Sequence, residues 1–241
     1  MEQLSWLRLK FMLDNYQNMA DAAAKKNCNH QKYLEDLLQG ETDLRWDNSI
    51  NRRITMARFP VVKTMEQFQW NWPSKINRSQ IQQLCRLNFI NQKANVIFLG
   101  GVGMGKTHLA TAIGYQAYLK GYGVLFTTAI DVINTLTADM AAGQLKKGLK
   151  RYLKPELLIL DELGYLPIDK RGADLLFQII SYRYEKGSIM LTSNRAYKDW
   201  AEIFNNDATL TSAILDRLLH HAETLIIEGK SYRMKEIVAI D

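Results

Sequence analysis

Cysteine, histidine and long apolar runs are all scarce in this sequence, and each scarcity argues against a class of protein. The two cysteines, Cys28 and Cys85, are far apart and lack metal-ligand spacing, so we expect neither a disulfide framework nor a zinc site. The four histidines show no ligand spacing with other donors. No apolar run approaches the ~20 residues that span a bilayer, and the first residues lack a signal-peptide pattern. We therefore expect a cytoplasmic protein without a membrane segment.

Acidic residues are outnumbered by basic ones, 25 against 31, which gives a net charge of +6 and a pI near 9.2. A basic balance favours polyanionic partners, nucleic acid first, although charge alone fits a merely soluble basic protein equally well. The 241 residues suffice for one α/β core with a small second domain beside it.

Proline is absent from the first 58 residues, and the only glycine there is Gly40. This composition predicts a helical N-terminal domain over residues 1–58 that binds DNA or a partner, with helices at about 4–18, 31–39 and 42–58 and a helix end at Gly40. Residues 59–78 carry Pro60 and Pro73 and predict an extended connector whose aromatic residues pack onto the next domain. Of these, Phe68 or Trp70 could border an adenine. Ser79 is expected to cap a short helix.

From residue 95 onward, short apolar strands alternate with helix-length segments. The predicted strands are residues 96–99, 124–127, 157–160, 189–192 and 224–227. Strands that are apolar on both faces and separated by helices indicate an α/β fold, with a five-stranded parallel sheet between helices. We expect this domain to occupy residues 79–241.

The strongest motif follows the first strand and precedes a predicted helix, as a Walker A phosphate-binding loop requires. Its glycines let backbone N–H groups approach phosphates, and the helix N-terminus favours an anion. We expect Lys106 to reach the β- and γ-phosphates and the Thr107 hydroxyl to ligate Mg²⁺. The predicted ATP-binding residues are Gly100, Gly101, Val102, Gly103, Met104, Gly105, Lys106, Thr107 and His108.

The third strand ends in two acids, which indicates a Walker B motif. We expect Asp161 to hold Mg²⁺, often through water, and Glu162 to act as the general base that activates the attacking water. An acidic strand end is common in isolation, but a phosphate-binding loop about 55 residues upstream favours the functional interpretation.

Two further polar residues are candidates for catalysis. Asn194 follows the fourth strand and, if that strand lies between the two Walker strands, could contact the γ-phosphate and the lytic water. An ordinary Ser-Asn turn is the alternative. Arg217 lies between apolar residues in a predicted helix and is placed to reach the ATP of a neighbouring subunit, although an arginine paired with Asp216 is also possible.

Two basic clusters suit a DNA backbone, although most charge runs are simply solvated faces. The predicted DNA-binding residues are Arg45, Arg52, Arg53 and Arg58 in the first cluster and Lys146, Lys147, Lys150 and Arg151 in the second.

Seven strings together resemble the IstB-like transposition helper ATPases, an AAA+ family related to DnaC-like helicase loaders and DnaA. They are Arg58-Phe59-Pro60, residues 64–68, the Walker A block, Asp161 to Pro167, Thr192 to Asn194, Ala213 to His221 and Gly229 to Arg233. The strings at Asp161 and at Ala213 are more diagnostic than the phosphate-binding loop, which thousands of unrelated ATPases share.

This resemblance implies an AAA+ ATPase that uses Mg²⁺ and ATP, forms a homo-oligomeric ring or spiral on double-stranded DNA, and helps a partner transposase to select and engage its target. It implies a sensor 1 role for Asn194 and a trans-acting finger role for Arg217. About two dozen residues follow Arg217, too few for the usual helical lid, and Arg233 is a candidate for part of the lid's work. Hydrolysis to ADP and phosphate is expected to act as an assembly switch.

Three other functions stay open at this point. A replicative helicase loader of the DnaC type has the same fold and would grip single-stranded DNA. A small-molecule P-loop kinase would need an acceptor pocket and a mobile lid, for which no sequence is evident. A DNA-coating scaffold without hydrolysis is disfavoured because both Walker B acids are present.

Overall fold

The structure is a computed structural model that describes residues 2–73 and 75–234, except for the side chains of residues 46–56. The chain divides into two compact units, residues 1–55 and 56–241. The predicted connector, residues 59–78, therefore belongs to the same unit as the sheet. No helix in the described part of the chain is long and apolar enough to cross a membrane.

The first unit is helical, but its helices end at different residues from those predicted. Helix α1 spans Glu2–Trp6, α2 spans Lys10–Lys25 and α3 spans His30–Ala57. The expected first helix is interrupted at residues 7–9, where Arg8 has a φ of 56°. Glu41 of α3 accepts hydrogen bonds from the backbone N–H groups of Phe11 and Met12, which satisfies donors at the start of α2 (2.8 and 3.3 Å).

Gly40 does not end a helix, contrary to the prediction, because α3 runs through it without a break. A Cβ atom at this position would collide with the aromatic ring of Phe11. The glycine therefore allows α2 and α3 to approach each other closely, at a cost of ~1 kcal/mol for glycine in a helix interior.

The second unit begins with the connector and two short helices. Helix α4 spans Arg78–Leu84 and α5 spans Asn88–Asn91. The cap of α4 is Asn77 rather than the expected Ser79, since the Asn77 side chain accepts the N–H of Gln80 at 3.1 Å.

The sheet of the second unit has five parallel strands in the order β2-β3-β4-β1-β5, as predicted in number and direction. Their bounds are Asn95–Gly100 for β1, Val124–Thr128 for β2, Leu157–Leu163 for β3, Ser188–Ser193 for β4 and Ala222–Ile227 for β5. Strand β4 thus lies between β1 and β3, the arrangement that the interpretation of Asn194 requires.

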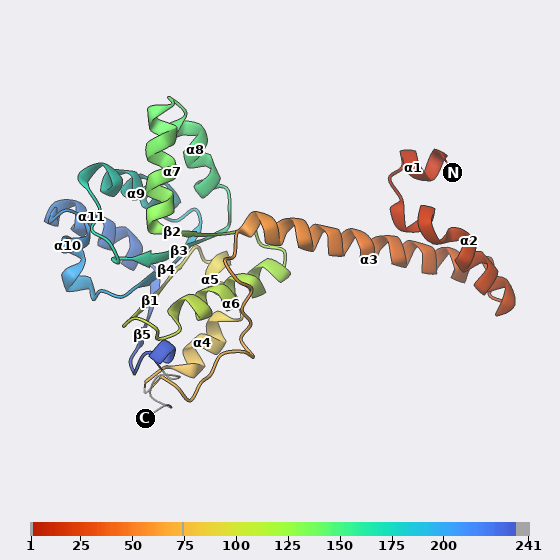
Figure 1. The fold of residues 1–241 in the computed structure, drawn as a ribbon, viewed down its shortest axis with the longest axis horizontal. Helices are drawn as coiled ribbons and strands as arrows, with labels where there is room; N and C mark the ends of the chain where they lie inside the picture. The colour runs from red at the N-terminus through yellow and green to blue at the C-terminus, as the bar shows by residue number, and fades with distance from the viewer. Residues whose placement is uncertain (1, 74, 235–241) are drawn as a thin grey trace. The chain divides into compact units, whose positions relative to one another are not determined.

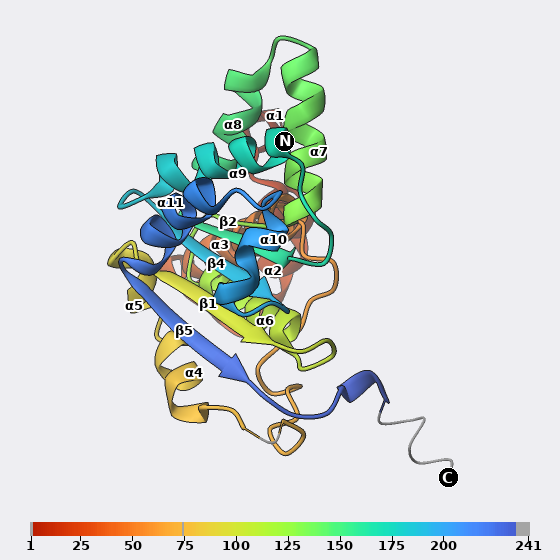
Figure 2. The same cartoon turned by 90° about the vertical axis from the view of Figure 1, so that its left-hand side faces the viewer.

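Helices cover both faces of the sheet (Figures 1 and 2). Helix α6, Lys106–Leu119, packs on one face, and α7, α9 and α11 pack on the other. Their bounds are Ala129–Ala141, Lys170–Arg183 and Ala208–Leu219, with α8 at Leu145–Leu153, α10 at Trp200–Ile203, and the 3₁₀ turns η1 and η2 at Tyr197–Asp199 and Tyr232–Met234. Because the strands are parallel, the loops that follow β1, β3 and β4 meet at one edge of the sheet.

Candidate nucleotide-binding site

The phosphate-binding loop connects β1 to α6, as its motif predicts. Gly103 and Gly105 have φ values of 74° and 86°, which favour glycine. A Cβ atom on Gly105 would come within 2.7 Å of the Phe68 ring, and one on Gly103 would collide with Ser231. Two segments distant in sequence therefore pack directly against this loop.

Lys106 is the first residue of α6 and is only 6% exposed. Its Nζ donates hydrogen bonds to the carbonyl oxygens of Gly100 and Gly101, both at 2.7 Å. Burial lowers the pKa of Lys106, while the nearby Asp161 opposes the shift. The ammonium group is thus held inside the loop, at the end of the helix that favours anions.

The two acids near the end of β3 have contrasting surroundings. Asp161 is 3% exposed, and its Oδ1 accepts hydrogen bonds from the hydroxyls of Thr107 (3.0 Å) and Thr192 (2.5 Å). Burial raises the pKa of Asp161, and these hydrogen bonds partly offset the rise. Glu162 is exposed and lines the cavity beside the loop.

Both acids lie in a bulge of β3. The ladder between β3 and β4 shifts register between Leu160 and Leu163, and Glu162 has a φ of 61°. Bulges of this kind redirect side chains and are common next to active sites.

A cavity of about 480 Å³ opens beside the phosphate-binding loop, and both Lys106 and Glu162 line it. The connector forms one wall, where Phe68 and Trp72 line the cavity and the Thr64 carbonyl bonds to the His108 ring at 2.9 Å. Of the two aromatics suggested for an adenine, Phe68 lines the cavity, whereas Trp70 packs edge-on against Phe68 outside the lining.

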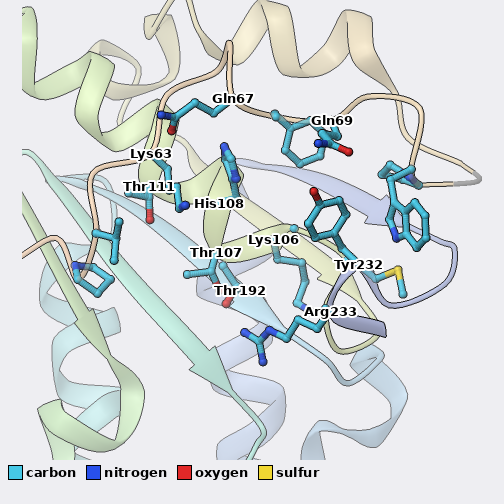
Figure 3. A pocket seen from close by; sticks show the side chains of 18 of the residues that line it. Lys63, Gln67, Gln69, Lys106, Thr107, His108, Thr111, Thr192, Tyr232 and Arg233 are labelled. Carbon is cyan, nitrogen blue, oxygen red and sulfur yellow. The ribbon is translucent and has the colours of Figure 1, made fainter. Parts of the chain in front are cut away.

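The segment after β5 forms another wall of this cavity. The backbone N–H of Tyr232 donates to the Gly103 carbonyl at 2.9 Å, and the Trp72 indole donates to the Lys230 carbonyl at 2.9 Å. Figure 3 shows the Arg233 side chain on the same side of the cavity as Lys106 and Thr192. A cation thereby reaches the site from a segment more than 120 residues after the loop.

Asn194 and Arg217 lie outside the lining of this cavity. The Asn194 Oδ1 atom is buried without a hydrogen-bond partner, and it lies on the loop after β4, beside Gly164. Arg217 is half-buried on α11, with its guanidinium 4.9 Å from the centre of the Phe177 ring and one hydrogen bond to the Ala213 carbonyl. Within this subunit, Arg217 therefore takes no part in the nucleotide cavity.

The predicted DNA-binding cations differ in their surroundings. Helix α8 presents exposed cations, and Lys154 follows as its C-cap. Arg45 instead bonds Glu41 at 3.0 Å and the Arg8 carbonyl at 3.2 Å. Arg58 is exposed, whereas the side chains of Arg52 and Arg53 lie outside the described residues. The exposed cations of α8 are Lys146, Lys147, Lys150 and Arg151.

The two histidines that follow α11 have an acidic neighbour that sequence spacing did not show. In the described part of the chain, Glu185, His220 and His221 place one ligand atom each within 4.8 Å of one another. All three are exposed and outside the nucleotide cavity, and such surface groups are common without a metal.

The sequence-based set of site residues lacks several residues of this cavity, among them Thr192, Tyr165 and Tyr232. Thr192 comes two residues before Asn194, and the expected position of β4 beside β3 could have singled it out. Tyr165 and Tyr232 lie within two of the strings that carry the family resemblance, but their sequence pattern gives neither of them a chemical role.

This sheet order, with the phosphate-binding loop after β1 and two acids near the end of β3, defines an AAA+ P-loop nucleotide-binding protein. The chain resembles the crystal structure of the DnaC helicase loader, with a TM-score of 0.55 and 26% identity over 68% of this chain and 96% of that one. It also resembles the replication initiator DnaA bound to AMPPCP and single-stranded DNA, with a TM-score of 0.57 and 26% identity over 73% of this chain and 53% of that one.

Within this class, the chain belongs to the family of IstB-like ATP-binding proteins, whose model matches residues 2–239. It is 42% identical to the insertion sequence IS21 putative ATP-binding protein of Pseudomonas aeruginosa, over 97% of this chain and 88% of that protein. The family resemblance and the AAA+ fold predicted from the sequence are confirmed, and the chain is an ATP-binding protein of the insertion-sequence type.

Proposed function

We propose that this protein is a Mg²⁺- and ATP-dependent DNA-binding ATPase that assembles on duplex DNA and assists a partner transposase in target selection and insertion. The observation that carries the proposal is the meeting of Lys106 and Glu162 in one cavity, with Asp161 and Thr107 bonded directly beside it. The insertion-sequence relatives add the genetic context in which a transposase is the expected partner.

Lys106 and the loop would bind the phosphates of ATP. The Lys106 ammonium, which bonds two loop carbonyls, can exchange these bonds for phosphate oxygens. Arg233 would contribute a second positive charge from the segment after β5. A bound triphosphate would then contact two cations, Lys106 and Arg233, and the N-terminus of α6.

Thr107 and Asp161 fit a magnesium ion. Their hydroxyl and carboxylate oxygens are hard donors 3.0 Å apart, and Mg²⁺ prefers few protein oxygens together with phosphates and water. When bound, the ion would neutralise charge on the phosphates. It would also offset the cost of an ionised Asp161 in a buried position.

Glu162 would accept a proton from the attacking water. Its side chain, within the bulge, is exposed to the cavity, whereas Asp161 is turned inward to the two threonine hydroxyls. Asn194 would orient the same water through its unpartnered buried Oδ1 atom, or would donate from its amide N–H group to a phosphate oxygen. The two acids thereby take different roles because the bulge gives them different surroundings.

Arg217 would act on the nucleotide of a neighbouring subunit. Its position outside the cavity of its own subunit supports a role in trans rather than in cis. ATP would then join two subunits, and loss of the γ-phosphate would loosen them.

Helix α8 would contact the DNA backbone. Its four cations and Lys154 are exposed, while its apolar residues pack against α7 and α9. These lysines can pair with backbone phosphates but do not form a pattern that reads base edges. Binding should therefore tolerate many DNA sequences.

Electron microscopy of the full chain with duplex DNA, with ATP and with ADP, tests the proposal. The expected result is a ring or spiral on duplex DNA that persists with ATP and is lost with ADP. Assembly only on single-stranded DNA would favour the helicase-loader alternative, and the absence of any ATP-dependent assembly on duplex DNA would overturn the proposal.

A further inference from the structure

Thr192, on β4, contacts both acids of the site. Its side-chain oxygen accepts the backbone N–H of Glu162 at 3.0 Å and donates to the carboxylate of Asp161 at 2.5 Å. A threonine hydroxyl carries a single proton, so donation to Asp161 leaves its lone pairs to accept from Glu162. The Thr192 hydroxyl is therefore a donor to Asp161 and an acceptor for the next residue, Glu162.

The bulge explains why Glu162 needs this partner. The ladder pairs Leu160 with Leu191 and resumes at Leu163 with Ser193, so β3 has one more residue than β4 in this interval. An extra residue in a bulge loses its regular ladder bond. The Glu162 N–H, displaced from the ladder, bonds the Thr192 hydroxyl instead, and the left-handed φ of 61° at Glu162 persists where surrounding contacts fix it.

The location of Thr192 supports a role beyond filling the core. Its side chain is 1% exposed, yet it lines the nucleotide cavity together with Lys106 and Glu162 (Figure 3). The Thr192 hydroxyl also shares the Asp161 Oδ1 atom with the hydroxyl of Thr107. Strand β4 is thereby connected to Asp161 and, through it, to Thr107, the two residues proposed to hold Mg²⁺.

We propose that Thr192 is a positioning residue for ATP hydrolysis, whose hydroxyl holds the bulge so that Asp161 faces Thr107 while Glu162 faces the attacking water. The inference rests on the proposed hydrolysis of ATP at this site. It assigns to Thr192 an effect on the chemical step, exerted through the two acids, rather than a contact with the nucleotide.

The test compares Thr192→Val with Thr192→Ser in the full chain. Valine has nearly the same shape but leaves the Glu162 N–H and the Asp161 carboxylate without this partner, whereas serine keeps the hydroxyl. We expect Thr192→Val to lower kcat about 10- to 100-fold, since a misplacement of ~1 Å can cost ~10²-fold, while Kd for ATP stays near the wild-type value and Tm falls only by the few degrees that the loss of one buried hydrogen-bonding group costs. Thr192→Ser should recover most of the lost rate.

Ser188→Ala is the matched control, because it removes another buried hydroxyl of β4 at the far end of the strand, where the partner is the Phe89 carbonyl. Its kcat should match the wild type. The inference is overturned if Thr192→Val keeps the wild-type kcat, if serine fails to restore the rate, or if ATP affinity and Tm fall in proportion to kcat. A wild-type protein that does not hydrolyse ATP would instead refute the proposed function itself.

Discussion

The hydroxyl of Thr107 donates a hydrogen bond to the carboxylate of Asp161 across 3.0 Å, which joins the first turn of α6 to the end of β3. Fifty-four residues separate the two in sequence. The contact brings together the two oxygen donors proposed for Mg²⁺, and it lies in a buried place where an ionised carboxylate is disfavoured.

Asp161→Asn should stabilise the protein without nucleotide while abolishing Mg²⁺-dependent hydrolysis. Burial raises the pKa of Asp161 in the folded state, so at neutral pH the ionised group lowers the free energy of unfolding, and an amide removes that cost. Each kcal/mol regained corresponds to a rise in Tm of about 2–4 °C for a protein of this size. Calorimetry at pH 7 measures the change, and a lower Tm would contradict the prediction.

Lys106→Ala should weaken ATP binding strongly and remove ATP-dependent assembly with it. The substitution removes a buried ammonium next to the loop carbonyls, and charge-assisted hydrogen bonds contribute about 1.5–3 kcal/mol, or roughly 10- to 100-fold in affinity. Titration with a fluorescent ATP analogue measures the loss. The exposed Lys120, at the other end of α6, provides a control as Lys120→Ala. Wild-type affinity in Lys106→Ala would refute the site.

Glu162→Gln should keep ATP bound but slow hydrolysis, because an amide cannot accept the proton of the water. The loss of a positioned general base typically lowers the rate ~10²- to 10⁴-fold. Phosphate release measures turnover, and filter binding measures the lifetime of the protein–DNA assembly, which should increase. Unchanged turnover would exclude Glu162 as the base.

Neutralising Lys146, Lys147 and Lys150 to Gln should flatten the salt dependence of DNA binding. Each phosphate contact adds about −0.9 to the slope of log affinity against log salt, so the slope should change by up to about 2.7. Affinity titrations on duplex DNA at several salt concentrations measure it.

The exposed lysines Lys120, Lys186 and Lys198 provide a matched control with the same loss of charge. Their triple Gln variant should retain a slope close to that of the wild type. An equal change in both triple variants would show that overall charge, rather than α8, governs DNA binding.

Arg217→Ala should leave ATP binding in an isolated subunit nearly intact and lower hydrolysis strongly, because trans-acting arginines contribute ~10³–10⁵ in some phosphoryl-transfer systems. Mixing this variant with Lys106→Ala should restore part of the activity, since their defects fall on opposite sides of one interface. Phosphate release from mixed assemblies measures the rescue. Absence of rescue, with mixing confirmed by differently tagged subunits, would remove Arg217 from the site.

The sheet and the phosphate-binding loop could be predicted because their signals are local. The strand at Asn95–Gly100 is apolar, and the positive φ values of Gly103 and Gly105 are a local backbone requirement that glycine meets. Gly40 could not be interpreted correctly, because its function depends on the Phe11 ring of another helix. A glycine between helical residues resembles a helix end until its tertiary neighbour is known.

Contacts between distant segments account for the rest of what was missed. Thr192 looks like an ordinary strand residue, and only the bulge in the neighbouring strand gives its hydroxyl two partners. The bond between Tyr232 and Gly103 likewise joins segments that no periodicity connects. The chemistry-bearing motifs were therefore accessible from the sequence, whereas the residues that hold them in place were not.

The attachment of the segment at Lys230–Arg233 to the phosphate-binding loop affects how nucleotide would exchange. The contacts that hold it there include one backbone bond to Gly103, one indole bond from Trp72, and the packing of the Trp72 and Tyr232 rings. Segments at a binding site can open by local unfolding at a fraction of the global free energy. If release of ADP requires this segment to move away from the loop, a single substitution at the Trp72–Tyr232 contact should change the rate of release.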